Sequence, residues 1–174
     1  MQIMIPPFHK AVIDSSPLFT ALTLELLERE PQAAISILDK YPLQPYLAND
    51  PTSQRNFRAL IDSIGEILTT SHVIGEIRSR FHVREYLHSK YWESNLDFFA
   101  KHNINEKLVT VAEMIQDLKL KQLVYEVGPI DTGLMQLAHQ EGCTLLTDDS
   151  NLYTWLGAFP GLSIELVKNL VSYA

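Results

Sequence analysis

Apolar residues follow two patterns along the chain, and these patterns predict its secondary structure. Short apolar runs predict strands, and longer stretches in which apolar residues recur every three or four positions predict helices. The predicted strands lie at 10–14, 124–128, 144–147 and 162–167. The predicted helices lie at 16–30, 31–41, 53–68, 105–122 and 129–142, and the segment 68–92 begins extended and becomes helical after Ser71.

Helix-capping residues and prolines sharpen these boundaries. Ser16, followed by Pro17, predicts the start of the helix at 16–30. Gly142 predicts the end of the helix at 129–142, because glycine readily adopts the left-handed conformation that closes a helix. The three prolines of segment 42–54 predict a loop.

The alternation of short strands and helices predicts an α/β sandwich, with helices on both faces of a parallel sheet of four or five strands. A chain of 174 residues, of which 46% are hydrophobic, suits a single domain over 1–174. No apolar stretch approaches the roughly 20 residues of a membrane span, and the first residues lack a secretory-signal pattern. Cys143 is the only cysteine, so no intrachain disulfide is expected, and we expect a cytoplasmic protein.

The net charge of −7 argues against a general electrostatic nucleic-acid binder, because such proteins use Lys and Arg to neutralise phosphates. Binding of RNA or DNA would need local help from divalent cations or a basic patch. The basic stretch is 78–92, in which Arg80 and Arg84 share a helix face with Glu76. This pattern favours a solvated helix face with a Glu–Arg pair, and a phosphate clamp is the alternative.

Acidic residues follow the predicted strands. Asp14 ends the first strand, and Asp148 and Asp149 follow the strand 144–147. The carboxyl ends of parallel strands meet at one edge of a sheet, where α/β proteins place their sites. Asp131 begins the helix that leads into 144–147, and we expect the positive end of that helix to keep its carboxylate ionised.

The tetrapeptide IGEI occurs twice, so two glutamates compete for a fourth acidic position. Glu76 lies one turn into a helix that follows an extended segment, whereas Glu66 lies late in the predicted helix 53–68. We therefore favour Glu76. Taken singly, each of these acids is most often a cap, a turn residue or a solvated side chain.

Clustered carboxylates predict a site for Mg²⁺ or Mn²⁺, which prefer oxygen ligands. Two such ions can activate a water and stabilise the leaving oxygen of a phosphodiester. The six histidines form no zinc-type pair with cysteine, and no serine-hydrolase elbow or glycine-rich phosphate loop occurs.

Four segments, VIDSSPLF, TTSHVIGEI, PIDTGLMQLAHQEG and TLLTDDSNL, occur in this order and resemble the PIN-domain nucleases, which include toxin ribonucleases of toxin–antitoxin pairs. The residues that match the family pattern are Asp14 followed by Ser15 and Ser16, then Glu76, Asp131, and the run Thr147–Asp148–Asp149. Asp149 takes the third position of that last motif. Thr147 resembles the polar residue that supports the first aspartate.

The resemblance implies a three-layer α/β/α fold and a Mg²⁺- or Mn²⁺-dependent ribonuclease. It implies Asp14, Glu76, Asp131 and Asp149 as metal ligands, with Asp148 as a further candidate. Ser16 and Thr147 join Arg80 and Arg84 as candidates for substrate contact. The long interval from Asp14 to Glu76 predicts an inserted helical segment around 31–56.

The resemblance also names partners: an RNA substrate, an antitoxin protein and a second copy of the chain, with no membrane. One alternative stays open, namely a non-catalytic PIN-like module that binds protein or RNA and retains the acids as relics.

Overall fold

The protein is described by a computed structural model that covers residues 8–80, 85–155, 157 and 160–172, with the backbone alone for 85–90. It contains a five-stranded sheet in the order β3-β2-β1-β4-β5, and every adjacent pair of strands is parallel. The strands are β1 (Ala11–Ile13), β2 (Ile67–Thr70), β3 (Ile104–Lys107), β4 (Thr144–Thr147) and β5 (Ser163–Leu166).

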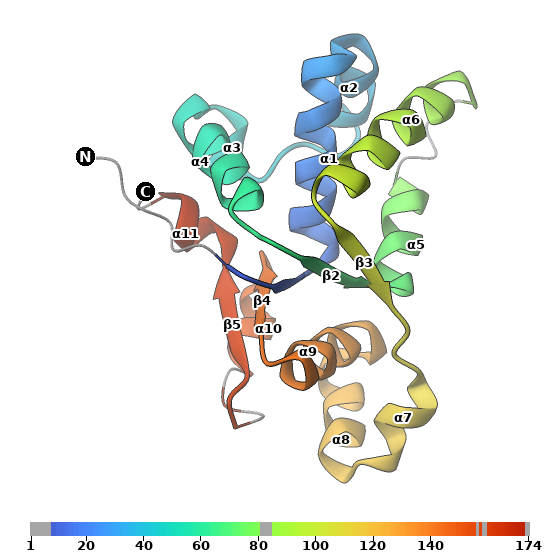
Figure 1. The fold of residues 1–174 in the computed structure, drawn as a ribbon, viewed down its shortest axis with the longest axis vertical. Coiled ribbons are helices and arrows are strands. Elements are labelled where there is room, and N and C mark those ends of the chain that lie inside the picture. The colour runs from blue at the N-terminus through green and yellow to red at the C-terminus, as the bar shows by residue number, and fades with distance from the viewer. Residues whose placement is uncertain (1–7, 81–84, 156, 158–159, 173–174) are drawn as a thin grey trace.

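Helices cover both faces of this sheet (Figure 1). One face carries α1 (Ser15–Arg29), which contacts α2 (Pro31–Leu38), α4 (Pro51–Asp62), α5 (Ser71–Arg80) and α6 (Glu85–Lys101). The opposite face carries α9 (Pro129–Glu141), which contacts α7 (Val111–Gln116) and α8 (Leu118–Val127). The remaining helices are α3 (Pro45–Ala48), α10 (Ser150–Tyr153) and α11 (Val167–Ser172). The predicted three-layer α/β/α fold is therefore confirmed.

The hydrophobic core lies between these layers. All residues of β1 and β2 are buried, as expected for central strands of a parallel sheet covered on both sides. Phe57 of α4 and Leu134 of α9 are fully buried on the two faces. Among the described helices, none is both long enough and apolar enough to cross a membrane.

Several predicted boundaries are confirmed. β4 coincides with the predicted strand 144–147, and β5 lies within 162–167. Gly142 closes α9 in a left-handed conformation with φ of 61°. The segment 31–56 contains α2, α3 and the first turns of α4; whether it is an insertion stays a prediction.

Other predictions were wrong. The helix predicted at 105–122 is replaced by β3, α7 and the first half of α8, because Thr110 and Asp117 each cap a new helix. The segment 124–128 is the end of α8 and not a strand. The loop predicted at 42–54 contains α3 and the start of α4, since Pro45 and Pro51 occupy first helical positions. The cap of α1 is Asp14 and not Ser16.

Candidate active site

The sheet topology brings the ends of β1 and β4 together. The strand order reverses at β1, which pairs with β2 on one side and with β4 on the other. In α/β proteins such a reversal opens a crevice at the carboxyl ends of the strands. Ile13 is in register with Leu146, so the next residues, Asp14 and Thr147, lie side by side at that edge.

The carboxylate of Asp14 is buried and held from two directions. One oxygen accepts the backbone N–H of Ser15 at the start of α1, and the other accepts the hydroxyl of Thr147 at 2.7 Å. Burial raises the pKa of Asp14, although these hydrogen bonds oppose the shift; the negative charge of Glu76 adds to it. Asp14 is thus a fixed acid near a second carboxylate.

Asp131 lies in the first turn of α9. Its pKa is raised to about 7, first because the side chain is partly buried and then because Asp14, Asp149 and Glu76 place negative charges near it. With this pKa the carboxyl is about half ionised at neutral pH, so burial and repulsion outweigh the stabilisation that the helix start was expected to supply. The same repulsion indicates that the four acids are neighbours.

The two glutamates of the IGEI segments occupy opposite edges of the sheet. Glu76 lies in α5, after the carboxyl end of β2, and its charge acts on Asp14 and Asp131. Glu66 precedes β2 at the amino edge, where its carboxylate lies 3.5 Å from the ammonium of Lys10 and accepts a hydrogen bond from Asn105 at 2.8 Å. Glu76 is thus the glutamate that accompanies the aspartates.

Asp148 and Asp149 are adjacent in sequence and have different surroundings. Asp149 caps α10 by accepting the backbone N–H of Asn151 at 2.7 Å. Asp148 accepts the phenol of Tyr46 at 2.8 Å and the hydroxyl of Ser16 at 3.4 Å. Burial raises the pKa of Asp148, and these hydrogen bonds oppose the shift. The carboxylate of Asp148 is therefore engaged by hydrogen bonds from residues of α1 and α3.

Sequence reasoning missed the residues around Asp148. Tyr46 belongs to α3, and Gln44, which caps that helix, donates a hydrogen bond to Ser16 at 3.0 Å. Burial and the charge of Asp148 raise the pKa of the Tyr46 phenol, so Tyr46 stays a hydrogen-bond donor. No motif marks either residue, because only the folded chain brings Tyr46 to Asp148 and Gln44 to Ser16.

Of the two arginines proposed as a phosphate clamp, Arg80 belongs to the described residues. Arg80 ends α5 and its guanidinium lies over the ring of Phe19 in α1, 5.5 Å from the ring centroid. This contact has the geometry of a cation–π interaction. Arg84 lies outside the described residues. Arg80 is thus anchored to the same helix that Asp14 caps.

The side chains of the candidate site offer the ligand atoms that a hard cation needs, but they are not gathered around one point. Among the described residues, no three His, Cys, Asp or Glu side chains are close enough together to hold one ion as they stand. All four acids offer oxygen, which Mg²⁺ and Mn²⁺ prefer, and the charges of the other three act on Asp131. The chemistry of the donor set therefore fits a divalent ion.

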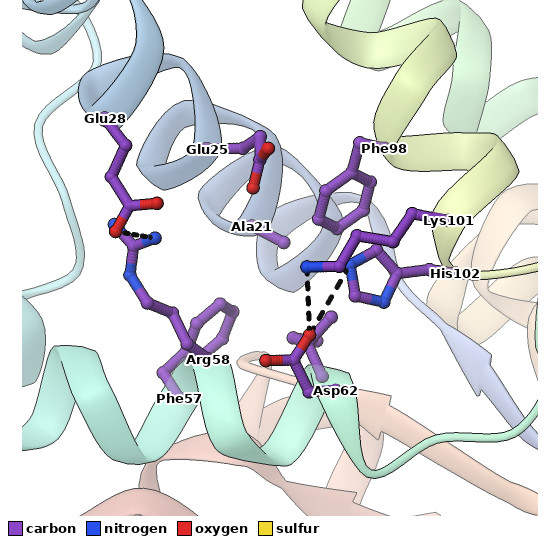
Figure 2. A pocket seen from close by; sticks show the side chains of 10 residues that line it. Ala21, Glu25, Glu28, Phe57, Arg58, Asp62, Phe98, Lys101 and His102 are labelled. Atoms are coloured by element: carbon purple, nitrogen blue, oxygen red, sulfur yellow. Dashed lines mark hydrogen bonds and ion pairs between the residues drawn. The ribbon is translucent and has the colours of Figure 1, made fainter.

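A separate cavity of about 220 Å³ lies between α1, α4 and the end of α6 (Figure 2). Phe57, Phe98 and Ala21 contribute its apolar lining. Asp62 lies 3.3 Å from the ammonium of Lys101 and 3.7 Å from the imidazole of His102. The cavity contains none of the acids at the carboxyl ends of the strands.

A model of the PIN domain family matches residues 43–154, which is more than half of the chain. The match contains Glu76, Asp131 and Asp149 and begins after Asp14, whose place beside them comes from the pairing of β1 with β4. No curated protein matches the chain.

Proposed function

The chain belongs to the PIN domain family, and on that premise we propose that it is an endoribonuclease that depends on Mg²⁺ or Mn²⁺. PIN domains are typically nucleases that use divalent metal ions. The observation that carries the proposal is that burial, together with the negative charges of three other carboxylates, raises the pKa of Asp131 to about 7. A buried group of like charges is unfavourable unless a cation compensates it.

In this proposal Asp14, Glu76, Asp131 and Asp149 hold the metal. When bound, the ion supplies an activated water and stabilises the leaving oxygen, so that hydrolysis leaves a 5′-phosphate and a 3′-hydroxyl. The chain contributes orientation: Thr147 fixes the carboxylate of Asp14 and accepts the backbone N–H of Asp149 at 3.0 Å. No side chain is needed as a nucleophile.

The substrate in this proposal is RNA, held beside the acids by a few groups. Arg80 and Arg84 contact phosphates next to the cleaved bond, and Ser16 and Thr147 lie at the same edge. Local cations are needed because the chain as a whole is acidic, with a net charge of −7. The proposal extends to a single cytoplasmic domain that acts as the toxin of a toxin–antitoxin pair, with an antitoxin protein and a second copy of the chain as partners.

The alternative is a non-catalytic PIN-like module that binds protein or RNA. The spacing of the acids favours it, because no three of them in the described part of the chain are close enough together to hold one ion. The two functions differ in one measurable property, namely the affinity of the folded protein for Mn²⁺.

The test is the shift of the melting temperature by millimolar Mn²⁺ at pH 7.5. A ligand that binds only the folded state stabilises it, by about 2.7 kcal/mol at a hundredfold excess over its dissociation constant. We expect a clear rise for the wild type and little or none for Asp131→Asn. Asp39→Asn is the matched control, because Asp39 is exposed at the end of α2, and it should respond like the wild type. Equal responses of wild type and Asp131→Asn would favour the non-catalytic module.

A further inference from the structure

The cavity between α1, α4 and the end of α6 has an apolar and a charged part (Figure 2). Phe57, Phe98 and Ala21 are buried and form the apolar part. The volume of about 220 Å³ is smaller than the roughly 300–1,000 Å³ of pockets that take drug-sized ligands. Apolar and aromatic walls with a few polar groups are the usual form of a ligand site, and this cavity has room for a single small molecule.

This cavity lies away from the acids of the candidate active site. α4 ends at Asp62 and α6 ends at Lys101, and these helix ends precede the amino ends of β2 and β3. Asp14, in contrast, follows the carboxyl end of β1. Because these strands are parallel, the two positions belong to opposite edges of the sheet. A ligand in the cavity therefore does not occupy the place of the proposed metal.

The positively charged groups of the lining already have partners. The two terminal nitrogens of Arg58 contact the carboxylate of Glu28 and donate to the carbonyl of Leu24 at 2.9 Å. The ammonium of Lys101 lies 3.3 Å from the carboxylate of Asp62, and its side chain is 55% exposed. The guanidinium of Arg58 is thus engaged at both ends, and water reaches Lys101. The charges of both residues are compensated before any ligand binds.

Two acceptors on different sides of the cavity are less well satisfied (Figure 2). The side chain of Glu25 is only 14% exposed; one oxygen pairs at 2.8 Å with Arg29, which is shared with Asp97. No hydrogen bond to its other oxygen occurs among the described residues. The imidazole of His102 is 5% exposed and lies 3.7 Å from Asp62. Within the described part of the chain its ring nitrogens make no hydrogen bond. Buried polar groups of this kind need a partner, which a ligand or water can supply.

The charge of the cavity depends on His102. Burial, and then the charge of Lys101, lower the pKa of its imidazole, although the charges of Asp62 and Glu25 oppose the shift. The imidazole is therefore mainly neutral at pH 7, and one of its nitrogens is an acceptor. The lining then contains three carboxylates and two cations, which gives a net charge of −1. This charge, the unpaired acceptors and the aromatic rings favour a cationic ligand.

We propose that this cavity binds a small organic amine with an apolar or aromatic body. The ammonium donates to the unpaired oxygen of Glu25 and to the acceptor nitrogen of His102, and the body of the ligand packs against Phe57 and Phe98. Hydrogen bonds from an ammonium to a carboxylate are stronger than those between neutral groups, and a nearby aromatic ring adds a cation–π attraction. An anion of the same size would meet the unpaired carboxylate oxygen and is therefore disfavoured.

The first test is an NMR titration of the full chain with phenethylammonium, and with phenylacetate as an anion of similar shape. We expect the amine to bind with a dissociation constant on the order of 1 mM, as its few non-hydrogen atoms allow. It should shift the backbone amide signals around Ala21, Glu25 and His102, and phenylacetate should bind about tenfold more weakly or not at all. Equal binding of the two probes, or amine-induced shifts confined to the surroundings of Asp131, overturns the proposal. So does the absence of any shift at about 20 mM amine.

The second test uses two variants that alter the cavity in different ways. Glu25→Gln keeps the shape of the side chain, removes its charge and should weaken amine binding about tenfold. Ala21→Leu places a larger side chain in the cavity and should abolish binding without changing any charge. Glu126→Gln is the matched control, because Glu126 is exposed on α8, and it should bind the amine like the wild type.

Wild-type affinity in either cavity variant, with its NMR spectrum showing a folded chain, contradicts the proposed site. Both tests are carried out without RNA or metal. Their failure therefore leaves the proposed nuclease activity untouched.

Discussion

The hydroxyl of Thr147 donates a hydrogen bond of 2.7 Å to the carboxylate of Asp14, across the boundary between β4 and β1. The same hydroxyl oxygen accepts the backbone N–H of Asp149 at 3.0 Å. One fully buried side chain therefore positions two of the acids that the proposed mechanism uses. Two hydrogen bonds at adjacent strand ends therefore set the positions of two of the four acids.

Replacing Thr147 by valine should remove both hydrogen bonds while keeping the shape of the side chain. We expect the free energy of unfolding to fall by about 1–2 kcal/mol, because buried groups lose their partners. Removing a group that orients a metal ligand typically costs about 10–100-fold in activity or metal affinity. Chemical denaturation and a metal titration would measure the two effects. Thr147→Ser keeps the hydroxyl and should retain most of the activity; a larger loss in Thr147→Ser than in Thr147→Val would mean that the methyl group matters and the hydrogen bonds do not.

The stability of the metal-free protein should depend on the protonation of Asp131. The pKa of this carboxyl is about 7 in the folded protein against an ordinary value of 3.8, so folding favours its protonated form. The resulting stabilisation is complete below pH 3.8 and is lost as the pH rises towards 7. Allowing for solvent screening of a partly exposed group, the loss amounts to about 1–2 kcal/mol.

Denaturation of wild type and Asp131→Asn in EDTA, at several pH values between 4 and 8, would measure this contribution as a difference. The stability of the wild type should decline relative to the variant as the pH rises, and saturating Mn²⁺ should abolish the decline. Parallel curves for the two proteins would show that the neighbouring carboxylates do not act on Asp131.

Asp148 and Asp149 provide a matched pair of neighbouring acids. Asp149→Asn should lose the response to Mn²⁺, because it removes a proposed ligand. Asp148→Asn should keep most of it, because the carboxylate of Asp148 is engaged by Tyr46 and Ser16 and an amide oxygen can still accept from the phenol. Calorimetric titration with Mn²⁺ would distinguish them, and the reverse order of effects would reassign the ligand to Asp148.

Arg80 offers a test of how an acidic chain holds RNA. If its guanidinium contacts a phosphate, Arg80→Ala should weaken binding of a short RNA and lower the slope of affinity against salt by about 0.7 for single-stranded RNA. Binding would be measured in Ca²⁺ to suppress cleavage. Arg78→Ala is the control on the same helix, since Arg78 is exposed in the last turn of α5. Identical salt slopes for all three proteins would identify Arg80 as part of a solvated face that only covers Phe19.

The sequence was sufficient to predict the three-layer fold, since strands such as 144–147 are short, have an apolar centre and are buried from Leu145 to Thr147. It failed for β3, an edge strand whose outer residues Glu106 and Lys107 are exposed, because an edge strand needs no apolar run. It also failed for 124–128, where Val124 and Val127 are half-buried residues of a helix. Five residues of mixed polarity do not distinguish a strand from a helical turn.

The acids of the site were easier to predict than their partners. Asp14 and Asp149 follow central strands, so local sequence order places them at one edge of the sheet. Tyr46 and Gln44 reach Asp148 and Ser16 from a segment with no local signal. Their positions depend on the packing of α3 against the rest of the domain, which no short pattern encodes.

The most direct test of the central claim is cleavage of an end-labelled RNA by wild type and Asp14→Asn, each with Mn²⁺ and with EDTA. Asparagine has one acceptor oxygen, so it can keep either the cap of α1 or the hydrogen bond from Thr147. The loss of one charge relieves repulsion and offsets the lost hydrogen bond, so the variant should be about as stable as the wild type. The proposed mechanism predicts that only the wild type with Mn²⁺ cuts the RNA, leaving 5′-phosphate and 3′-hydroxyl ends. Cleavage by folded Asp14→Asn, or by the wild type in EDTA, would contradict it.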